Sequence, residues 1–316
     1  MRSQSADKPR LRPAQVPAAS HPSLFLLAAG ICLVGLIGVY LFFVRTTTGQ
    51  YIDESALEEA TALAQGRTAK ATTQFLDYLP VISLVLASAA VLFVAVRFRR
   101  RLAAVVAVVT AAGANLSTQW LKADVFDRPF RGISTLDFNS LPSGHTTLAA
   151  SAAAAVFLVV APRWRPLAAF GGGSYAVATG VSTLVNQWHR PADVVAAFLV
   201  VGFWTALGGL AILRTGTDWN TWDGYGEHWA SSQLWPLLSA LAGVGAAGVA
   251  VYSLAQIAPG SAQHVSTVNY LWAGACLIVI FGYLLTVAGT VLFGGAAGRR
   301  PRPELQSAAR RVRGTQ

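Results

Sequence analysis

Long apolar stretches alternate with short charged segments along this chain. Eight of the stretches are close to the roughly 20 residues that a helix needs to cross a membrane. They cover residues 23–44, 79–96, 102–121, 146–161, 167–185, 193–213, 235–255 and 269–293. The pattern predicts an all-α fold: a polytopic membrane helical bundle of about eight transmembrane helices.

The composition agrees with an integral membrane protein. The chain is 54% hydrophobic and 12% charged, whereas soluble domains carry about 25% charged residues. The net charge of +10 lies in short segments between apolar stretches, as in membrane proteins, so nucleic acid is not an expected partner. Cys32 and Cys276 lie inside apolar stretches and are expected to be buried free thiols. No Cys or His spacing predicts a metal site, and we expect no cofactor.

The basic residues also predict an orientation. The first stretch is long enough for a retained span rather than a cleaved signal peptide. With both termini cytoplasmic, 17 of the 24 Lys and Arg residues lie in inner segments, as the positive-inside rule requires. We therefore expect a multi-pass protein of the cell (plasma) membrane.

This layout divides the chain into five parts. They are a cytoplasmic basic tail (1–22), a six-span membrane domain (23–213), a cytoplasmic interfacial loop (214–234), two additional transmembrane helices (235–293) and a second cytoplasmic basic tail (294–316). The interfacial assignment of the loop rests on its tryptophans, because indole rings favour the headgroup layer.

Two further segments predict local structure but no chemistry. Residues 53–65 are rich in Ala, Glu and Leu and predict a short outer helix capped by Asp53, solvated or on the membrane surface, with no chemistry assigned. The glycine run at residues 171–173 is expected to serve close helix packing.

Candidate chemistry gathers at the outer ends of the middle spans. Residues 142–145 read Pro-Ser-Gly-His and open the fourth span. The free N–H groups of a first helical turn form an anion site. Ser143 adds a hydroxyl and His145 can bring a proton.

A second histidine opens the sixth span in a similar way. Pro191 suits a first helical position, which places Asp193 in the first turn. From there the carboxylate of Asp193 can accept a proton from one ring nitrogen of His189, which leaves the other nitrogen as a nucleophile. Lys122 and Arg128, on the same face by the predicted topology, provide positive charge for phosphate oxygens.

These residues resemble the type 2 phosphatidic acid phosphatase superfamily, which includes vanadium haloperoxidases and bacterial acid phosphatases. The Pro-Ser-Gly-His block is complete, and Ser182, His189 and Asp193 keep the family's spacing. The resemblance runs from Lys122 to Asp193 and implies a six-helix phosphatase-like core.

The resemblance implies a hydrolase that is independent of metal and acts on a membrane lipid phosphate or diphosphate at the outer face. The implied substrates are of the polyprenyl diphosphate, phosphatidic acid or phosphatidylglycerophosphate class. His189 would form a phosphohistidine with Asp193 orienting it, and His145 would serve as acid and then as base. The implied phosphate ligands are Lys122, Arg128, Ser143, Gly144 and Ser182.

The sequence departs from the family pattern in two places. Five residues rather than six separate Lys122 from Arg128, and Thr183 stands where the family has its second arginine. Arg190 or Arg131 is the hypothetical replacement, and Arg190 is included among the phosphate-binding candidates. Two alternatives remain open: a phosphotransferase that uses the same phosphohistidine, and a non-catalytic protein that binds or transports lipid phosphates. The sequence does not specify the lipid or the oligomeric state.

Overall fold

A computed structural model describes residues 21–63, 67–133, 139–215, 221–222, 228–257 and 268–299. The elements within these ranges are α1 (Pro22–Val39), which continues as a π-helix (Tyr40–Val44), α2 (Thr47–Leu63), α3 (Arg67–Arg97), α4 (Arg101–Trp120), which continues as a second π-helix (Leu121–Val125), α5 (Gly144–Val159), a 3-10 turn (Pro162–Trp164), α6 (Arg165–Val185), α7 (Pro191–Thr215), β1 (Thr221–Trp222), a 3-10 turn (Trp229–Ser231), α8 (Leu234–Ala255), α9 (Asn269–Gly295) and β2 (Gly298–Arg299). The two short strands pair in parallel.

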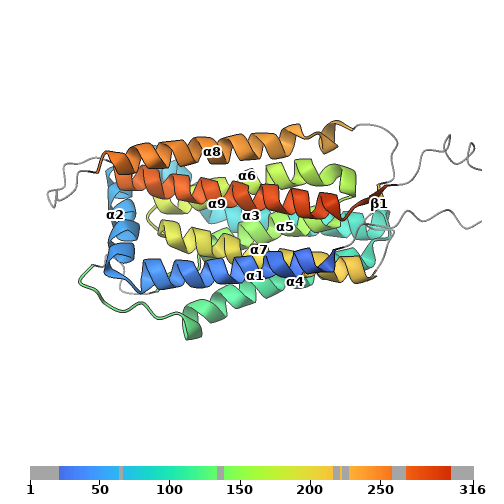
Figure 1. Cartoon of the computed structure of the whole chain (residues 1–316), viewed down its shortest axis with the longest axis horizontal. Coiled ribbons are helices and arrows are strands. Elements are labelled where there is room, and N and C mark those ends of the chain that lie inside the picture. Colours follow the sequence, from blue (N-terminus) through green and yellow to red (C-terminus); the bar gives the residue numbers. More distant parts are fainter. Residues whose placement is uncertain are drawn as a thin grey trace, which may run out of the picture.

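The long helices form a bundle with roughly parallel axes, and each of the eight predicted stretches overlaps one of them (Figure 1). Among the described residues, five helical stretches are long and apolar enough to cross a membrane. They are Pro22–Val44, Arg101–Val125, Pro191–Arg214, Trp229–Ala255 and Asn269–Gly295. Two shorter apolar helices, Ile82–Arg97 and Gly144–Val159, also overlap predicted stretches. The all-helical membrane fold is thus confirmed.

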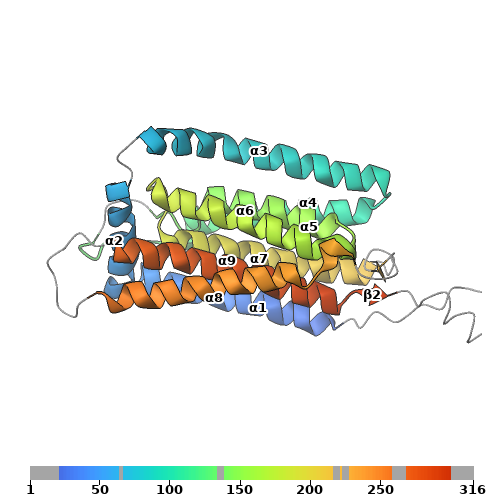
Figure 2. The same cartoon turned by 90° about the horizontal axis from the view of Figure 1, so that it is seen from above.

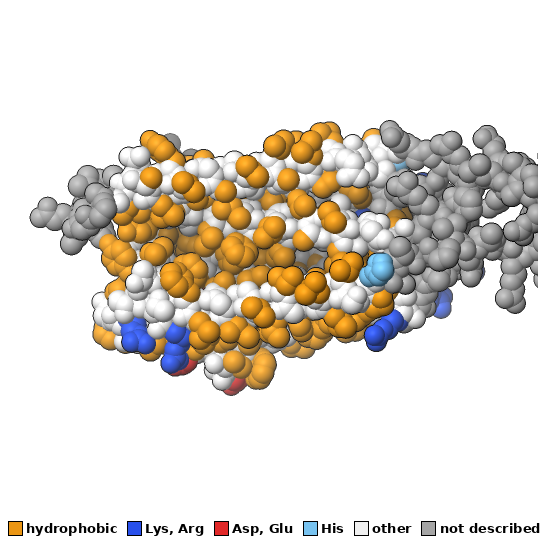
Figure 3. All heavy atoms as spheres, viewed as in Figure 1, with side chains coloured by type: hydrophobic (Ala, Val, Ile, Leu, Met, Phe, Trp, Pro, Cys, Tyr) orange, Lys and Arg blue, Asp and Glu red, His pale blue; other side chains and the backbone are white. Residues whose placement is uncertain are grey.

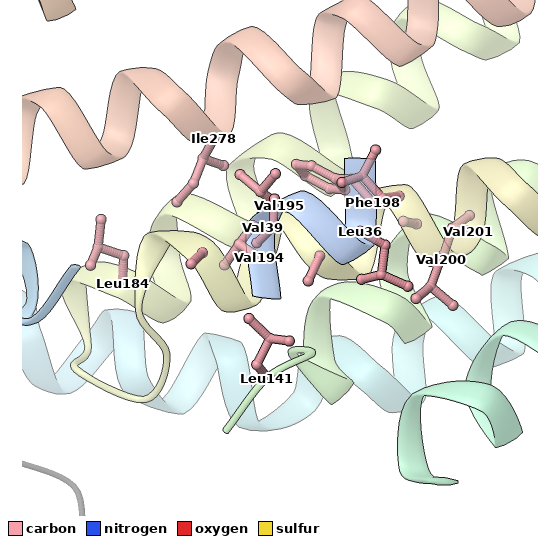
Figure 4. Packing of buried hydrophobic residues seen from close by; sticks show 14 of the residues in the cluster. Leu36, Val39, Leu141, Leu184, Val194, Val195, Phe198, Val200, Val201 and Ile278 are labelled. Atoms are coloured by element: carbon pink, nitrogen blue, oxygen red, sulfur yellow. The ribbon is translucent and has the colours of Figure 1, made fainter. Parts of the chain in front are cut away.

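Helix α7 lies at the centre of the bundle and packs against α1, α4, α5 and α9. Its sequence is apolar on nearly every side, which is typical of a helix that is surrounded by others. Figure 4 shows Val194, Val195 and Phe198 of α7 meeting side chains from α1, α6 and α9. The same cluster contains Leu141, from the segment before α5, so the core reaches the starts of α5 and α7.

Close packing accounts for two of the three glycines at residues 171–173. A Cβ added at Gly172 would lie 2.8 Å from Ala153 Cβ on α5, and one added at Gly173 would collide with Thr286 of α9. Nothing lies within 4 Å of the corresponding position at Gly171. The predicted packing role is confirmed for the two glycines that face a neighbouring helix.

Helix α2 crosses one end of the bundle, nearly perpendicular to the other helices (Figures 1 and 2). The predicted short helix, capped by Asp53, was wrong in its start and in its setting. The helix begins at Thr47, and residues 53–57 are buried. Asp53 lies inside it and caps α7 instead. We call this end of the bundle the α2 end.

The two cysteines lie in the interior of the bundle. Cys32 and Cys276 are both buried and free, as expected.

Figure 3 shows a mostly hydrophobic face between the two ends of the bundle, with charged side chains close to the ends. A hollow in this face, between α1 and α9, belongs to an apolar cavity of about 630 Å³ (Figure 3). Neither His145 nor His189 lines this cavity.

Candidate active site

The first histidine lies in the first turn of α5, at the α2 end. Ser143 is the N-cap residue, and its Oγ accepts a hydrogen bond from the Thr146 amide at 3.3 Å. The backbone N–H of Ser143 donates to the carbonyl oxygen of Asp193 at 2.9 Å. This bond ties the start of α5 to the start of α7, so His145 is held beside the second histidine.

The second histidine lies in the turn between α6 and α7. The amides of Trp188 and His189 donate to the carbonyl oxygen of Thr183 at 2.9 and 3.3 Å. Gln187 adopts the left-handed conformation at φ 61°. The turn therefore folds back on the last residues of α6 and places His189 two residues before Pro191, where α7 begins.

The two imidazole rings lie close together. Their centroids are 6.1 Å apart, and the indole ring of Trp188 lies 5.0 Å from the ring of His145. Trp188 was not singled out in the sequence, where a tryptophan at a membrane boundary reads as an anchor. In the structure it packs on the His145 ring.

Asp193 lies in the first turn of α7, as predicted, and is fully buried. Its Oδ2 atom is 3.4 Å from His189 Nδ1, which is long for a hydrogen bond. The same Oδ2 accepts from the Arg190 amide at 3.0 Å and from Ser140 Oγ at 2.5 Å. The carboxylate is thus fixed on the side of His189 that carries Nδ1.

Ser140 was missed by the sequence reasoning. It is buried between two charged groups, because it donates to Asp193 and accepts from Arg190 Nη1 at 2.8 Å. Nothing in a lone serine before an apolar residue indicates such a position. Its role follows only from the folding of the segment before α5 onto the turn before α7.

The cationic side chains are placed at different depths. Lys122 is half-buried in the second π-helix, within electrostatic range of Asp193. The side chain of Arg128 is 6% exposed and that of Arg190 is fully buried. Burial, and then repulsion by Arg190, lowers the pKa of Arg128.

Glu54 of α2 joins the two arginines. Its carboxylate pairs with Nε and Nη2 of Arg190, and its Oε2 lies 3.4 Å from Nη2 of Arg128. The side chain of Glu54 is 1% exposed. A bidentate pair between a guanidinium and a carboxylate is directional, so Glu54 fixes the plane of the Arg190 group.

Two more carboxylates of α2 satisfy the amides at the starts of other helices. Asp53 Oδ1 accepts from the Ala192 amide of α7 at 2.9 Å, and Glu59 Oε2 accepts from the Leu271 amide of α9 at 2.7 Å. Burial, and then the charge of Asp193, raises the pKa of Asp53 to about 8. The prediction that these residues are solvated was therefore wrong, because Asp53 and Glu54 are buried. The polar residues of α2 are spaced like a solvated face, but that face is turned toward the bundle.

The remaining candidates lie around this centre. Gly144 is the first residue of α5, and Ser182 is half-buried near the end of α6. Thr183 is buried, and its hydroxyl donates to the Gly180 carbonyl at 2.8 Å. Arg131, the other suggested replacement for the family arginine, is exposed and donates to the Arg45 carbonyl at 3.1 Å.

Within the part of the chain that the structure describes, no three His, Cys, Asp or Glu side chains are grouped to hold a metal ion. The groups that meet at the α2 end are two histidines, one oriented carboxylate and fixed cations. Such a set is suited to positioning an anion, to proton transfer and to nucleophilic attack.

Comparison with known families agrees with this arrangement. The model of the PAP2 superfamily matches residues 80–217, less than half of the chain but all of the segment from Lys122 to Asp193. The resemblance found in the motifs is confirmed over that segment. Searches of curated proteins and of solved structures gave no match. The matched family indicates an enzyme that hydrolyses phosphate esters.

Proposed function

Since residues 80–217 form a PAP2-superfamily segment, we propose that this chain is a membrane phosphatase for lipid phosphates. It removes the phosphate from a lipid phosphate or diphosphate through a phosphohistidine at His189. The substrate is of the polyprenyl diphosphate, phosphatidic acid or phosphatidylglycerophosphate class.

One observation carries the proposal: the two histidine rings lie close together, and a buried carboxylate stands behind His189. Asp193 lies on the Nδ1 side of His189, while the ring of His145 is 6.1 Å away and packs on Trp188. A carboxylate on one nitrogen sets the tautomer and leaves the other for attack. The carboxylate behind His189 supports this residue as the nucleophile, and the neighbouring His145 then serves as acid and base.

The reaction then has two balanced steps. In the first, His189 Nε2 attacks phosphorus, the bond from phosphorus to the leaving oxygen breaks, and His145 gives that oxygen a proton. In the second, His145 takes a proton from water, the water oxygen bonds to phosphorus, and the bond from phosphorus to nitrogen breaks. Inorganic phosphate leaves and both histidines return to their starting states.

Fixed positive groups stabilise the charge on the phosphoryl oxygens during both steps. Lys122 and Arg128 supply this charge, together with the Gly144 amide and the hydroxyl of Ser143 at the start of α5, and Ser182 lies nearby. Arg190 adds a second guanidinium in place of the arginine that Thr183 replaces. Its burial beside Asp193 supports Arg190 rather than the exposed Arg131.

The position of the site supports a lipid substrate. The site lies at the ends of membrane-spanning helices, where lipid headgroups are found, and the distribution of Lys and Arg supports an extracytoplasmic position for this end. In this orientation both termini are cytoplasmic, and the protein lies in the plasma membrane. A phosphate carried by a lipid reaches the histidines without leaving the membrane surface.

The test is phosphate release by the purified protein in detergent with EDTA present. Polyprenyl diphosphate, phosphatidic acid and phosphatidylglycerophosphate are supplied in parallel, and His189→Ala is the matched inactive variant. Wild-type protein releases phosphate and forms an acid-labile phosphoenzyme, and the variant does neither. Equal release by the two proteins contradicts the proposal.

The same assay separates the alternatives. Formation of a phosphoenzyme whose phosphoryl group passes to an added alcohol, with no release to water, identifies a phosphotransferase. Binding of the lipid with neither phosphoenzyme nor release identifies a binding or transport protein. The test includes a binding or transport protein because Thr183 stands where the family has its second arginine.

A further inference from the structure

We propose that Glu54, outside the family segment, is the positioning residue that sets both the charge and the geometry of this site. The inference rests on the proposed function, because it concerns the same phosphate and the same nucleophile. Glu54 acts through Arg190 and Arg128, with which its carboxylate pairs.

The first step of the argument is burial. Arg190 is fully buried, and the side chain of Glu54 is 1% exposed. A buried guanidinium without a counter-charge is strongly unfavourable. Glu54 supplies the carboxylate that pairs directly with the Arg190 guanidinium and holds it in its position beside Asp193.

The second step is the path from Glu54 to the nucleophile. Arg190, held in one plane by Glu54, donates from Nη1 to Ser140 Oγ at 2.8 Å. Ser140 in turn donates to the Oδ2 atom of Asp193 at 2.5 Å. That same oxygen faces His189 Nδ1. The links from Glu54 to Asp193 are directional hydrogen bonds, so a displaced Glu54 shifts the carboxylate that lies 3.4 Å from His189 Nδ1.

The third step is charge. One carboxylate is shared by two guanidinium groups, Arg190 on one side and Arg128 on the other. Glu54 therefore cancels one of the two positive charges that an incoming phosphate meets. This balance allows phosphate to bind at the site and still to leave after turnover.

Charge and geometry predict opposite effects on binding and on rate. In Glu54→Gln the negative charge is lost, so inorganic phosphate binds about tenfold more tightly. The plane of Arg190 is also released, so kcat falls by about 10- to 100-fold. A variant that merely folds poorly gives less active protein, with an unchanged Kd for phosphate.

Three further variants separate the two effects. Glu54→Asp keeps the charge but shortens the side chain, so its Kd for phosphate returns to the wild-type value and kcat recovers only in part. Ser140→Ala breaks the path without changing charge, so kcat falls and the Kd is unchanged. Glu58→Gln, an exposed position on the same helix, is the matched control and keeps wild-type values of both.

The experiment uses the full-length protein in detergent, with radiolabelled inorganic phosphate for Kd and the lipid assay for kcat. Equal Kd values for wild type and Glu54→Gln overturn the proposal, as does an unchanged kcat in both Glu54→Gln and Ser140→Ala. Phosphate binding needs no turnover. A wild-type protein that binds phosphate but releases none from lipids contradicts the proposed function alone, and the Kd comparison still decides the role of Glu54.

Discussion

The buried pair of Arg190 and Glu54 allows a quantitative prediction about stability. Both side chains are almost completely removed from solvent, so water does not screen their interaction. Removing one partner of a buried pair typically costs about 3–5 kcal/mol, since the other charge is left uncompensated. The structure indicates which single variant lies at which end of this range.

Arg190→Met leaves Glu54 with Arg128, 3.4 Å away, so its cost lies at the lower end, about 3 kcal/mol. Glu54→Met leaves two buried guanidinium groups without their carboxylate, so its cost lies at the upper end, about 5 kcal/mol. The double variant leaves only Arg128 without its partner, and we expect a cost of about 2–3 kcal/mol. The two changes therefore couple by about 5 kcal/mol.

The measurement is the free energy of unfolding of the four proteins in mixed micelles, by equilibrium titration with a denaturing detergent. The exposed pair of Arg45 and Asp127, whose side chains are 41% and 72% exposed, provides the control, and Arg45→Met is expected to leave stability unchanged. A double variant whose loss equals the sum of the two single losses refutes the reasoning, because the two side chains would then act independently.

Three other perturbations test separate parts of the structure. Burial raises the pKa of Asp53 from 3.8 to about 8, so the free energy of unfolding should decrease as pH rises between these values. Asp53→Asn should flatten this dependence in a stability titration. Trp188→Ala removes the ring that packs on His145 and should lower kcat by about tenfold. Trp188→Phe should keep most of the wild-type kcat, and equal kcat values for the wild type and both variants would contradict a positioning role. A Cβ at Gly180 would lie 2.5 Å from Cγ1 of Val194, so Gly180→Ala should lower the free energy of unfolding by about 1–3 kcal/mol. An unchanged unfolding titration would show that α6 and α7 move apart easily.

The parts of the site that the sequence predicted depend on local signals. The proline at position 191 begins α7, and the cap at Ser143 begins α5, as their positions indicate. Pro191 therefore predicts that Asp193 lies in the first turn of α7, and Ser143 predicts that His145 lies in the first turn of α5. Capping preferences and apolar length act within a few residues, so they can be read from the sequence alone.

The parts that were missed depend on contacts between distant segments. Glu54 and Arg190 are separated by 136 positions in the chain, and no local pattern relates them. Gln50, Asp53, Glu54 and Leu57 are all buried, at the spacing of one helical face. Three polar residues on such a face are equally compatible with solvent. Only the position of α2 across the bundle decides which environment the face meets.

The position of α2 also bears on how this protein can be divided. The family segment, residues 80–217, contains both histidines and all the cations of the proposed site, yet the carboxylates that balance Arg190 and complete the first turn of α7 come from outside it. The segment is therefore not an autonomous module. Expressed alone or grafted onto another protein, the segment would keep its catalytic side chains but lose the Glu54 carboxylate that pairs with Arg190. A partner helix with carboxylates at the spacing of Asp53 and Glu54 would have to be supplied.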